Sequence, residues 1–253
     1  MDTKRPDRLT IAAFIVSTVL AANNAIAVRF SNAELPPFFG AGIRFAAAAL
    51  ILFIIVLCLR LPLPKGRSLL GVMIFGALQF GLSYSLLYWS LLRVPAGMAM
   101  VFLSVGPLFT FFFAILHRQE SFRWRVLAGG LVAVGGIAVI FRDQITASIP
   151  LLSLTAILVA AACFSEASVL YKTFPKSHPI TTNAVAMAVG AAILFLLSPL
   201  SGESPQWPTL PATWIALIYL IFLGGRFVFR KVRGSAPKKE QPQDTPTTAI
   251  EKK

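Results

Sequence analysis

Long runs of apolar residues, separated by short connections that carry basic residues, dominate this chain of 253 residues. Crossing the hydrocarbon layer of a membrane takes a helix of roughly 20 mostly apolar residues, because the backbone polar groups must be paired within the segment. About eight runs reach or approach this length, at residues 9–29, 36–59, 68–92, 96–116, 126–141, 150–171, 181–199 and 212–229. The strands of a membrane barrel would alternate apolar and polar residues over about ten positions, and these runs do not alternate. The sequence therefore predicts an all-α fold, a polytopic helical membrane protein with about eight transmembrane helices.

The charged residues are few and lie mainly at the ends of the runs. They make up 13% of the chain, against roughly 25% in an ordinary soluble domain. The net charge of +13 is carried by no soluble basic domain, so we expect the lipid bilayer and not nucleic acid as the partner. Even without the C-terminal tail, the predicted inner connections hold 11 Lys and Arg residues and the outer connections hold 3. The positive-inside rule then places both termini on the cytoplasmic side of the plasma (inner) membrane.

The order of the runs divides the chain into four segments. A short cytoplasmic start (1–8) precedes a unit of five spans (9–141), and three further spans (150–229) precede a basic tail (230–253). Because five is an odd number, the second unit begins on the opposite face of the membrane, which is how inverted-topology repeats arise in secondary transporters. The tail has almost nothing to bury, so we expect it to be disordered in the cytoplasm.

A set of short motifs in these spans has an order and spacing found in a known transporter family. The motifs are Pro36-Pro37, Arg44-Phe45, Tyr88-Trp89-Ser90-Leu91-Leu92, Pro95-Ala96-Gly97-Met98-Ala99, Pro107-Leu108, Glu120, Gly129-Gly130 and Gly135-Gly136. On these motifs the chain resembles EamA-type members of the drug/metabolite transporter superfamily over about residues 9–222. The resemblance implies ten spans in two inverted five-span repeats, with the substrate cavity between the repeats.

The chain departs from that pattern after Gly224-Gly225, where a basic tail stands in place of the last two spans. A frameshift, a truncated gene or a real short variant would each give this sequence. The second repeat is therefore expected to be incomplete, and a homodimer is one way in which a complete cavity could form.

Arg44 and Glu166 are the only charged residues well inside the predicted spans. A charge at mid-membrane costs at least about 2.5–3.5 kcal/mol on insertion scales, so it usually faces the bundle interior or a water-filled cavity. Arg44 could neutralise an anionic group of a substrate, or extend outward to the membrane surface. Glu166, nearer the inner end, could take up a coupling proton, or pair locally near the inner face. Their different depths argue against direct contact between them.

Tyr84 and Tyr88 lie one helical turn apart in the third span, with Gln79 and Ser83 on a neighbouring face. This surface suits a pocket for a metabolite of mixed polarity. An aromatic stripe at helical spacing also fits plain packing, so both interpretations stay open.

Asn23 and Asn24 are adjacent amides in the otherwise apolar first span. Such amides either bond a neighbouring helix or line a polar cavity. We count both among the candidate substrate-binding residues.

Two features bear on the shape of spans four and five. Pro107 lacks a backbone N–H and clashes with the preceding turn, so it predicts a kink that serves either as a hinge or as simple bending. Gly129, Ala133 and Gly136 form a smooth strip that predicts close contact with a neighbouring helix.

No catalytic constellation is present in the sequence. His117 and His178 lie on predicted cytoplasmic connections without a second ligand at metal spacing, and no phosphate-binding loop occurs. We therefore expect no enzymatic activity, no metal and no other cofactor. The sequence predicts a secondary transporter that exports small metabolites by alternating access, and the alternative is a non-transporting membrane subunit or a degenerate, truncated transporter.

Overall fold

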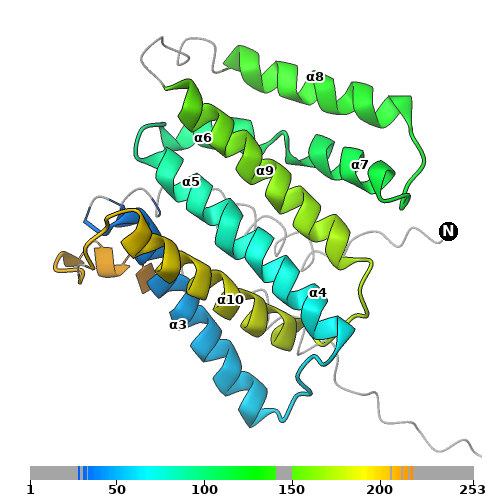
Figure 1. The fold of residues 1–253 in the computed structure, drawn as a ribbon. Helices are drawn as coiled ribbons and strands as arrows, with labels where there is room; N and C mark the ends of the chain where they lie inside the picture. The colour runs from blue at the N-terminus through cyan, green and yellow to red at the C-terminus, as the bar shows by residue number, and fades with distance from the viewer. Residues whose placement is uncertain are drawn as a thin grey trace, which may run out of the picture.

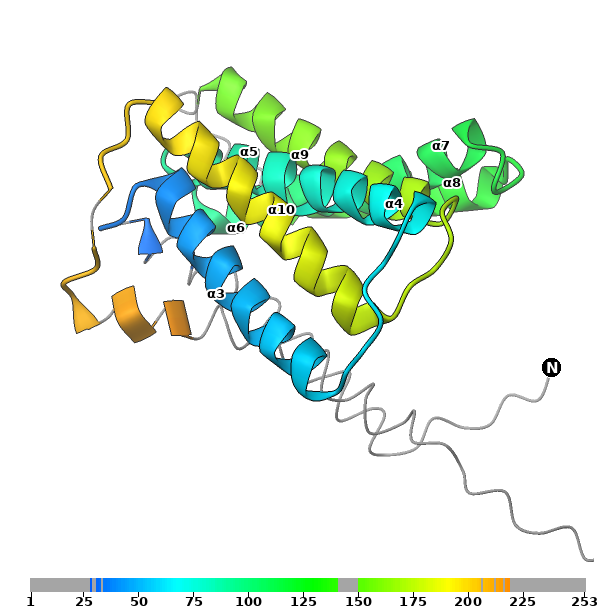
Figure 2. The ribbon, with the colours of Figure 1, turned by 60° about the horizontal axis from the view of Figure 1, so that its bottom comes forward.

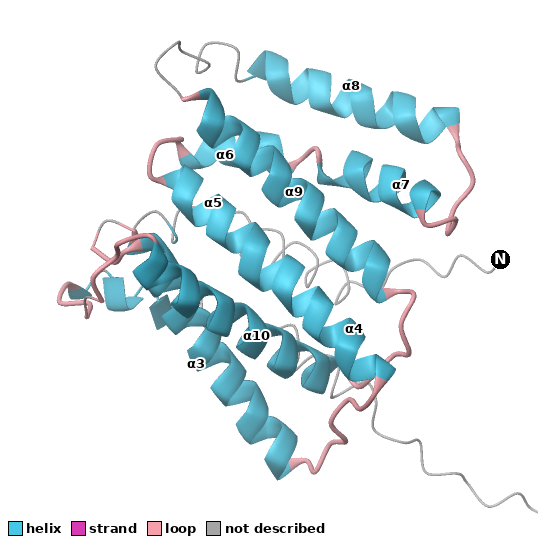
Figure 3. Ribbon diagram, in the orientation of Figure 1, coloured by secondary structure: helices cyan, strands magenta, loops and turns pink. Residues whose placement is uncertain are grey.

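The computed structural model describes residues 28, 31–32, 34–140, 150–205, 207–211, 213–215 and 217–218. Within these residues the chain consists of helices joined by loops and turns, with no strand (Figure 3). The helices are α3 (Pro37–Cys58), α4 (Arg67–Gly76), the π-helical segment η1 (Ala77–Leu82), α5 (Ser83–Leu91), α6 (Ala96–Leu103), α7 (Gly106–Leu116), α8 (Trp124–Ile140), α9 (Leu151–Tyr171) and α10 (Pro179–Leu200).

Five stretches of these helices are long and apolar enough to cross a membrane. They are Pro37–Cys58, Arg67–Leu91, Ala96–Leu116, Leu151–Tyr171 and Pro179–Leu200. This confirms the prediction of a polytopic helical membrane protein. Most of the first and eighth predicted spans, with the predicted cytoplasmic start and the basic tail, lie outside the described residues.

Proline marks the start of several helices. Pro36, Pro95 and Pro150 directly precede α3, α6 and α9, and Pro179 is the first residue of α10. Proline suits the first helical turn, because its missing N–H would have no partner there and its φ is already near the helical value. These four spans accordingly begin within two residues of the predicted positions.

The helices are stacked side by side, and segments distant in sequence become neighbours (Figure 1). Helices α3 and α10 make the most extensive contact between elements of the described chain, and α10 also packs on η1 and α4. Helix α9 contacts the third span (α4, η1 and α5) and also contacts α6 and α7. Figure 2 shows α10 and α3 side by side in a second view. The third span therefore lies between α9 and the pair formed by α10 and α3.

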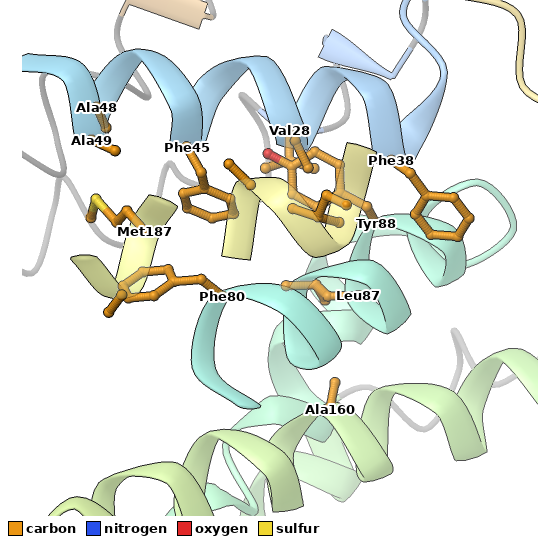
Figure 4. Close-up of a cluster of buried hydrophobic side chains, with 14 of the residues drawn as sticks. Val28, Phe38, Phe45, Ala48, Ala49, Phe80, Leu87, Tyr88, Ala160 and Met187 are labelled. Carbon is orange, nitrogen blue, oxygen red and sulfur yellow. The ribbon is translucent and has the colours of Figure 1, made fainter. Parts of the chain in front are cut away.

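Close approach of α10 to the third span depends on two glycines. A Cβ atom at Gly76 would lie 2.5 Å from the carbonyl oxygen of Ala186, and one at Gly190 would lie 2.3 Å from Cβ of Phe80. Small residues at such positions let helix backbones approach one another within a membrane. The core beside this contact includes Phe45, Phe80, Tyr88 and Met187 (Figure 4).

Large apolar side chains on the outside of the bundle are exposed to a degree that a soluble protein rarely shows. Leu57, Val132, Leu151 and Leu200 are each at least 75% exposed. In a membrane such side chains face the lipid tails, which agrees with the predicted spans.

The predicted glycine strip of span five does not contact α7 at its two glycines. Positions 129 and 136 have no atom of the described chain within 4 Å of where a Cβ would lie, and Gly130 instead meets Leu108 of α7. Gly130 therefore faces α7, and contact of the strip with another helix stays a prediction.

Candidate functional site

Arg44 lies two turns into α3 and is buried, with 5% of its surface exposed. Its Nη1 donates a hydrogen bond of 3.0 Å to the hydroxyl oxygen of Tyr88 on α5. Its guanidinium carbon also lies 5.0 Å from the ring centre of Phe45 and 5.4 Å from that of Tyr84. Of the two alternatives for Arg44, extension to the membrane surface therefore does not describe the structure. A cation over aromatic faces is stabilised by their negative quadrupole, which partly offsets its removal from water.

Tyr84 is the centre of an aromatic cluster that joins three spans. Its ring centre lies 4.8 Å from Phe45 of α3, 5.2 Å from Phe164 of α9, and 6.2 Å from both Phe80 and Tyr88 of its own span. The structure thus brings Arg44, Tyr84 and Tyr88 together, whereas sequence spacing had related only the two tyrosines. Figure 4 shows Phe45, Phe80 and Tyr88 facing one another between α3 and the third span.

The π-helical segment η1 interrupts the third span just before this cluster. The Ser83 hydroxyl donates a hydrogen bond of 2.6 Å to the carbonyl of Leu78, so it pairs with a backbone carbonyl of the π-helical segment. Oε1 of Gln79 is buried and accepts no hydrogen bond in the described structure. Single π-helical turns within α-helices are frequent at functional sites. Of the two polar groups that the sequence placed beside the tyrosines, only Gln79 thus retains an unpaired polar atom.

Glu166 lies on α9, away from Arg44, and its partner is His117. The His117 Nε2 and Glu166 Oε1 atoms are 2.7 Å apart, in the only ion-pair geometry between residues of the described chain. His117 directly follows α7, so the pair joins the ends of α7 and α9 on the predicted inner face. Sequence reasoning placed both residues toward the same membrane face, which was the available signal, but it did not predict that they would be in contact.

Pro107 stands one residue after the start of α7, and the fourth span is interrupted at Ser104 and Val105. The interruption falls where the missing N–H of proline predicts it. The carbonyl of Gly106 accepts hydrogen bonds from Thr110, over 3.0 Å, and from Ser165 of α9, over 2.8 Å. The hinge role of Pro107 stays a prediction.

Two glutamates that sequence reasoning missed hold the predicted outer end of the bundle. The carboxylate of Glu203, which follows α10, accepts hydrogen bonds of 3.0 Å from the backbone N–H groups of Phe38 and Phe39. These are N–H groups of the first turn of α3, which has no acidic residue of its own. A negative charge there satisfies donors that lack helical partners and opposes the helix dipole.

Glu34 makes a second contact of this kind. Its carboxylate accepts hydrogen bonds from the Thr209 hydroxyl and from the backbone N–H groups of Thr209 and Leu210. The Thr209 hydroxyl, followed by that of Thr213, lowers the pKa of Glu34 to about 2. Glu34 and Glu203 therefore link the first five-span unit to the second in both directions.

The remaining candidates can be placed briefly. Asn23 and Asn24 lie outside the described residues, so their proposed roles stay predictions. Within the described part of the chain, no group of three or more His, Cys, Asp or Glu side chains is arranged to hold a metal ion.

Comparison with known proteins agrees with this architecture. Residues 8–142 match the EamA-like transporter family. Over 191 residues the chain is 30% identical to a probable biotin transporter of Pseudomonas aeruginosa, which covers 68% of this chain and 64% of the relative. It is 28% identical over 179 residues to a probable terminal-alkyne amino-acid exporter of Streptantibioticus cattleyicolor, covering 70% of this chain and 59% of the relative.

A third relative is the uncharacterized inner membrane transporter YedA of Escherichia coli K12, 26% identical over 201 residues, or 78% of this chain and 64% of the relative. The chain thus spans less than two thirds of the length of these relatives. The family match covers more than half of the chain and confirms the resemblance seen in its motifs. This multi-pass membrane protein belongs to the EamA-like transporter family.

Proposed function

We propose that the protein is a secondary transporter that exports a small, carboxylate-bearing metabolite across the plasma membrane by alternating exposure of a central site. The observation that carries the proposal is the burial of Arg44 within an apolar bundle, against Tyr88 and beside Tyr84. An ionisable residue inside a membrane span is costly, and such residues commonly mark a substrate or ion pathway.

The chemistry of arginine supports a carboxylate as the recognised group. A guanidinium has five N–H donors in a planar fork that matches a carboxylate bidentately. Arg44 donates to Tyr88 through Nη1 alone, which is compatible with its binding a carboxylate as well. The names of two relatives point the same way, because biotin and amino acids both carry a carboxylate.

The aromatic cluster supports a substrate that is apolar or planar outside its carboxylate. Tyr84 and Phe164 come from different spans, with ring centres 5.2 Å apart in an edge-to-face arrangement, so a relative movement of α5 and α9 would change this surface. The interruption of the fourth span before Pro107 offers a joint for such movement. We propose that Arg44 provides the counter-charge, Tyr84 and Tyr88 shape the site, and Pro107 lies at the hinge.

The test is exchange by purified protein in liposomes, with radiolabelled biotin and a labelled terminal-alkyne amino acid as probes. Arg44→Ala should slow exchange of the transported probe by about 10- to 100-fold, the equivalent of a lost charged hydrogen bond. Arg44→Lys keeps the charge but loses the fork, so it should be intermediate. Arg93→Ala is the matched control, since Arg93 lies beside Trp89 near the predicted outer face.

Equal amounts of each variant must elute as folded protein, which separates a loss of transport from a loss of folding. If wild-type protein exchanges neither probe, the proposal of carboxylate transport is wrong and the non-transporting subunit is favoured. If Arg44→Ala exchanges as fast as Arg93→Ala, the role assigned to Arg44 is wrong.

A further inference from the structure

The His117–Glu166 pair lies at the end of α7 and α9 opposite to the predicted outer face. Its two atoms are 2.7 Å apart, and the side chains of His117 and Glu166 are 28% and 24% exposed. A pair this close shares a proton or carries opposite charges. Its location differs from the site of Arg44, which is near the start of α3.

The second oxygen of Glu166 distinguishes the pair from an ordinary surface ion pair. Oε2 is buried and accepts no hydrogen bond in the described structure. Most buried polar atoms of folded proteins are hydrogen-bonded, so an unpartnered carboxylate oxygen needs an explanation. When the pair holds one proton, either the carboxyl is neutral or an imidazolium balances it. Loss of that proton leaves a carboxylate that is half-satisfied and has no counter-charge.

The surroundings do not replace that counter-charge. No Lys or Arg side chain of the described chain lies within 4.0 Å of the Glu166 carboxylate. The other titratable groups on α9, on the helices packed against it and on the adjoining ends are Arg67, Tyr84, Tyr88, Arg118, Glu120, Cys163, Tyr171 and Lys172. His117 is therefore the only cation-forming side chain in contact with Glu166 within the described residues.

The pair also joins α9 to a helix that is separated from the first part of its own span. Helix α7 is separated from α6 by the interruption at Ser104 and Val105. Besides the pair, α7 and the turn after it touch α9 through two hydrogen bonds of 2.8 Å, from Ser165 to the Gly106 carbonyl and from Gln119 to the Val169 carbonyl. Neither of these two hydrogen bonds involves an ionisable group. Of these three polar contacts between α7 and α9, the His117–Glu166 pair is therefore the one that gain or loss of a proton can strengthen or weaken.

We propose that His117 and Glu166 together form the proton-binding site that couples transport to the pH gradient. The pair takes up one proton in one orientation of the transporter and releases it in the other, as α7 shifts against α9. This inference rests on the proposed transport function and adds His117 to the residues that serve it.

The first experiment separates coupling from transport, with radiolabelled biotin as the probe. Counterflow at equal pH needs no driving force, whereas accumulation under an imposed pH difference, with the membrane potential clamped by potassium and valinomycin, needs a proton site. One proton per substrate sets a ceiling of about tenfold accumulation per pH unit. We expect His117→Gln and Glu166→Gln to keep counterflow and to lose accumulation.

Two matched controls lie on the same predicted face. His178→Asn removes the other histidine but keeps a group that can accept from the N–H of Ile180 at the start of α10. Glu120→Gln neutralises an exposed glutamate close to His117 in the chain. Both controls should retain counterflow and accumulation. Accumulation that is unchanged in Glu166→Gln overturns the proton site while leaving the transport function intact.

A second measurement needs no substrate. Cys163 is partly buried on α9, one turn before Glu166 on the same face, and Cys58→Ser leaves it as the single thiol. Its labelling by a water-soluble maleimide is followed across pH, and each rate is divided by the thiolate fraction measured by ultraviolet absorbance in the same folded variant, because burial and the Glu166 charge both affect the ionisation of this thiol. We expect a pH-dependent labelling rate that becomes independent of pH in Glu166→Gln and His117→Gln.

The two measurements fail in different ways. If wild-type protein shows counterflow of neither biotin nor the labelled terminal-alkyne amino acid, carboxylate transport is contradicted, and the labelling profile still decides whether the pair responds to protons. Identical labelling profiles in the Cys58→Ser parent and in Glu166→Gln would overturn the proposed site.

Discussion

Replacing Gly76 by alanine tests how closely the third span approaches α10. The added Cβ would lie 2.5 Å from the carbonyl oxygen and 2.7 Å from Cα of Ala186. Both are backbone atoms, so no side chain can turn away to make room. An ordinary contact begins near 3.4 Å, and the two helices would have to separate locally by about 0.9 Å.

The expected cost follows from two opposing effects. Overpacking a tight contact typically destabilises by about 1–3 kcal/mol, while alanine gains about 1 kcal/mol over glycine in helix propensity. The net free energy of unfolding should therefore fall by up to about 2 kcal/mol, or roughly 4–8 °C in the thermal midpoint for a chain of this size. Because η1 and α5 follow Gly76 directly, the rate of probe exchange should fall as well.

The assay is thermal unfolding of purified protein in detergent, followed by tryptophan fluorescence. Gly129→Ala on α8 is the matched control, since no described atom lies within 4 Å of the Cβ it would add. Its midpoint should stay equal to the parent value or rise slightly. A midpoint in Gly76→Ala that rises above the parent value, as the helix propensity of alanine alone predicts, would refute the close approach of the third span to α10.

Three further predictions concern polar contacts. Tyr88→Phe removes the oxygen that accepts from Arg44 and should cost about 1.5–3 kcal/mol, measured as a lower thermal midpoint. Glu203→Ala leaves two N–H groups of α3 without their acceptor and should cost about 1–2 kcal/mol in the same assay. The folded-state pKa of Glu34 is about 2, below its ordinary 4.5, so its contribution is complete above pH 4.5 and is lost as the pH falls toward 2. The stability difference between wild type and Glu34→Gln should therefore be constant above pH 4.5 and shrink below it, and a difference that grows in acid would contradict this sign.

Much of the fold follows from local sequence. The spans could be located because apolar runs end at basic residues and because proline favours the first turn of a helix, as at Pro95 and Pro150. The interruption of span four could be located for a similarly local reason, the missing N–H of Pro107. The π-helical segment could not, because nothing in the sequence of Ala77–Leu82 sets it apart from the apolar residues on either side.

The candidate site shows the same division between local and tertiary information. The spacing of Tyr84 and Tyr88 predicted a shared surface, because residues four apart lie on one face of a helix. Their contact with Arg44 depends on how α3 packs on α5, and 44 residues separate the bonded partners Arg44 and Tyr88. The two glutamates at the predicted outer end escaped notice because each bonds backbone N–H groups, which carry no sequence signature.

The two ends of the bundle differ in how protons can act on them. At the predicted outer end, Glu34 binds hydroxyl and backbone N–H groups, and its pKa of about 2 keeps it charged at any physiological pH. At the other end, the carboxylate of Glu166 lies 2.7 Å from a histidine, a side chain that can accept or release a proton. Under the proposed coupling, gain or loss of a proton by this pair alters the contact between α7 and α9 and leaves the Glu34 contact unchanged. In the proposed transport cycle this asymmetry assigns the proton-dependent step to the predicted inner end, and the outer contacts must then open through substrate binding or helix movement.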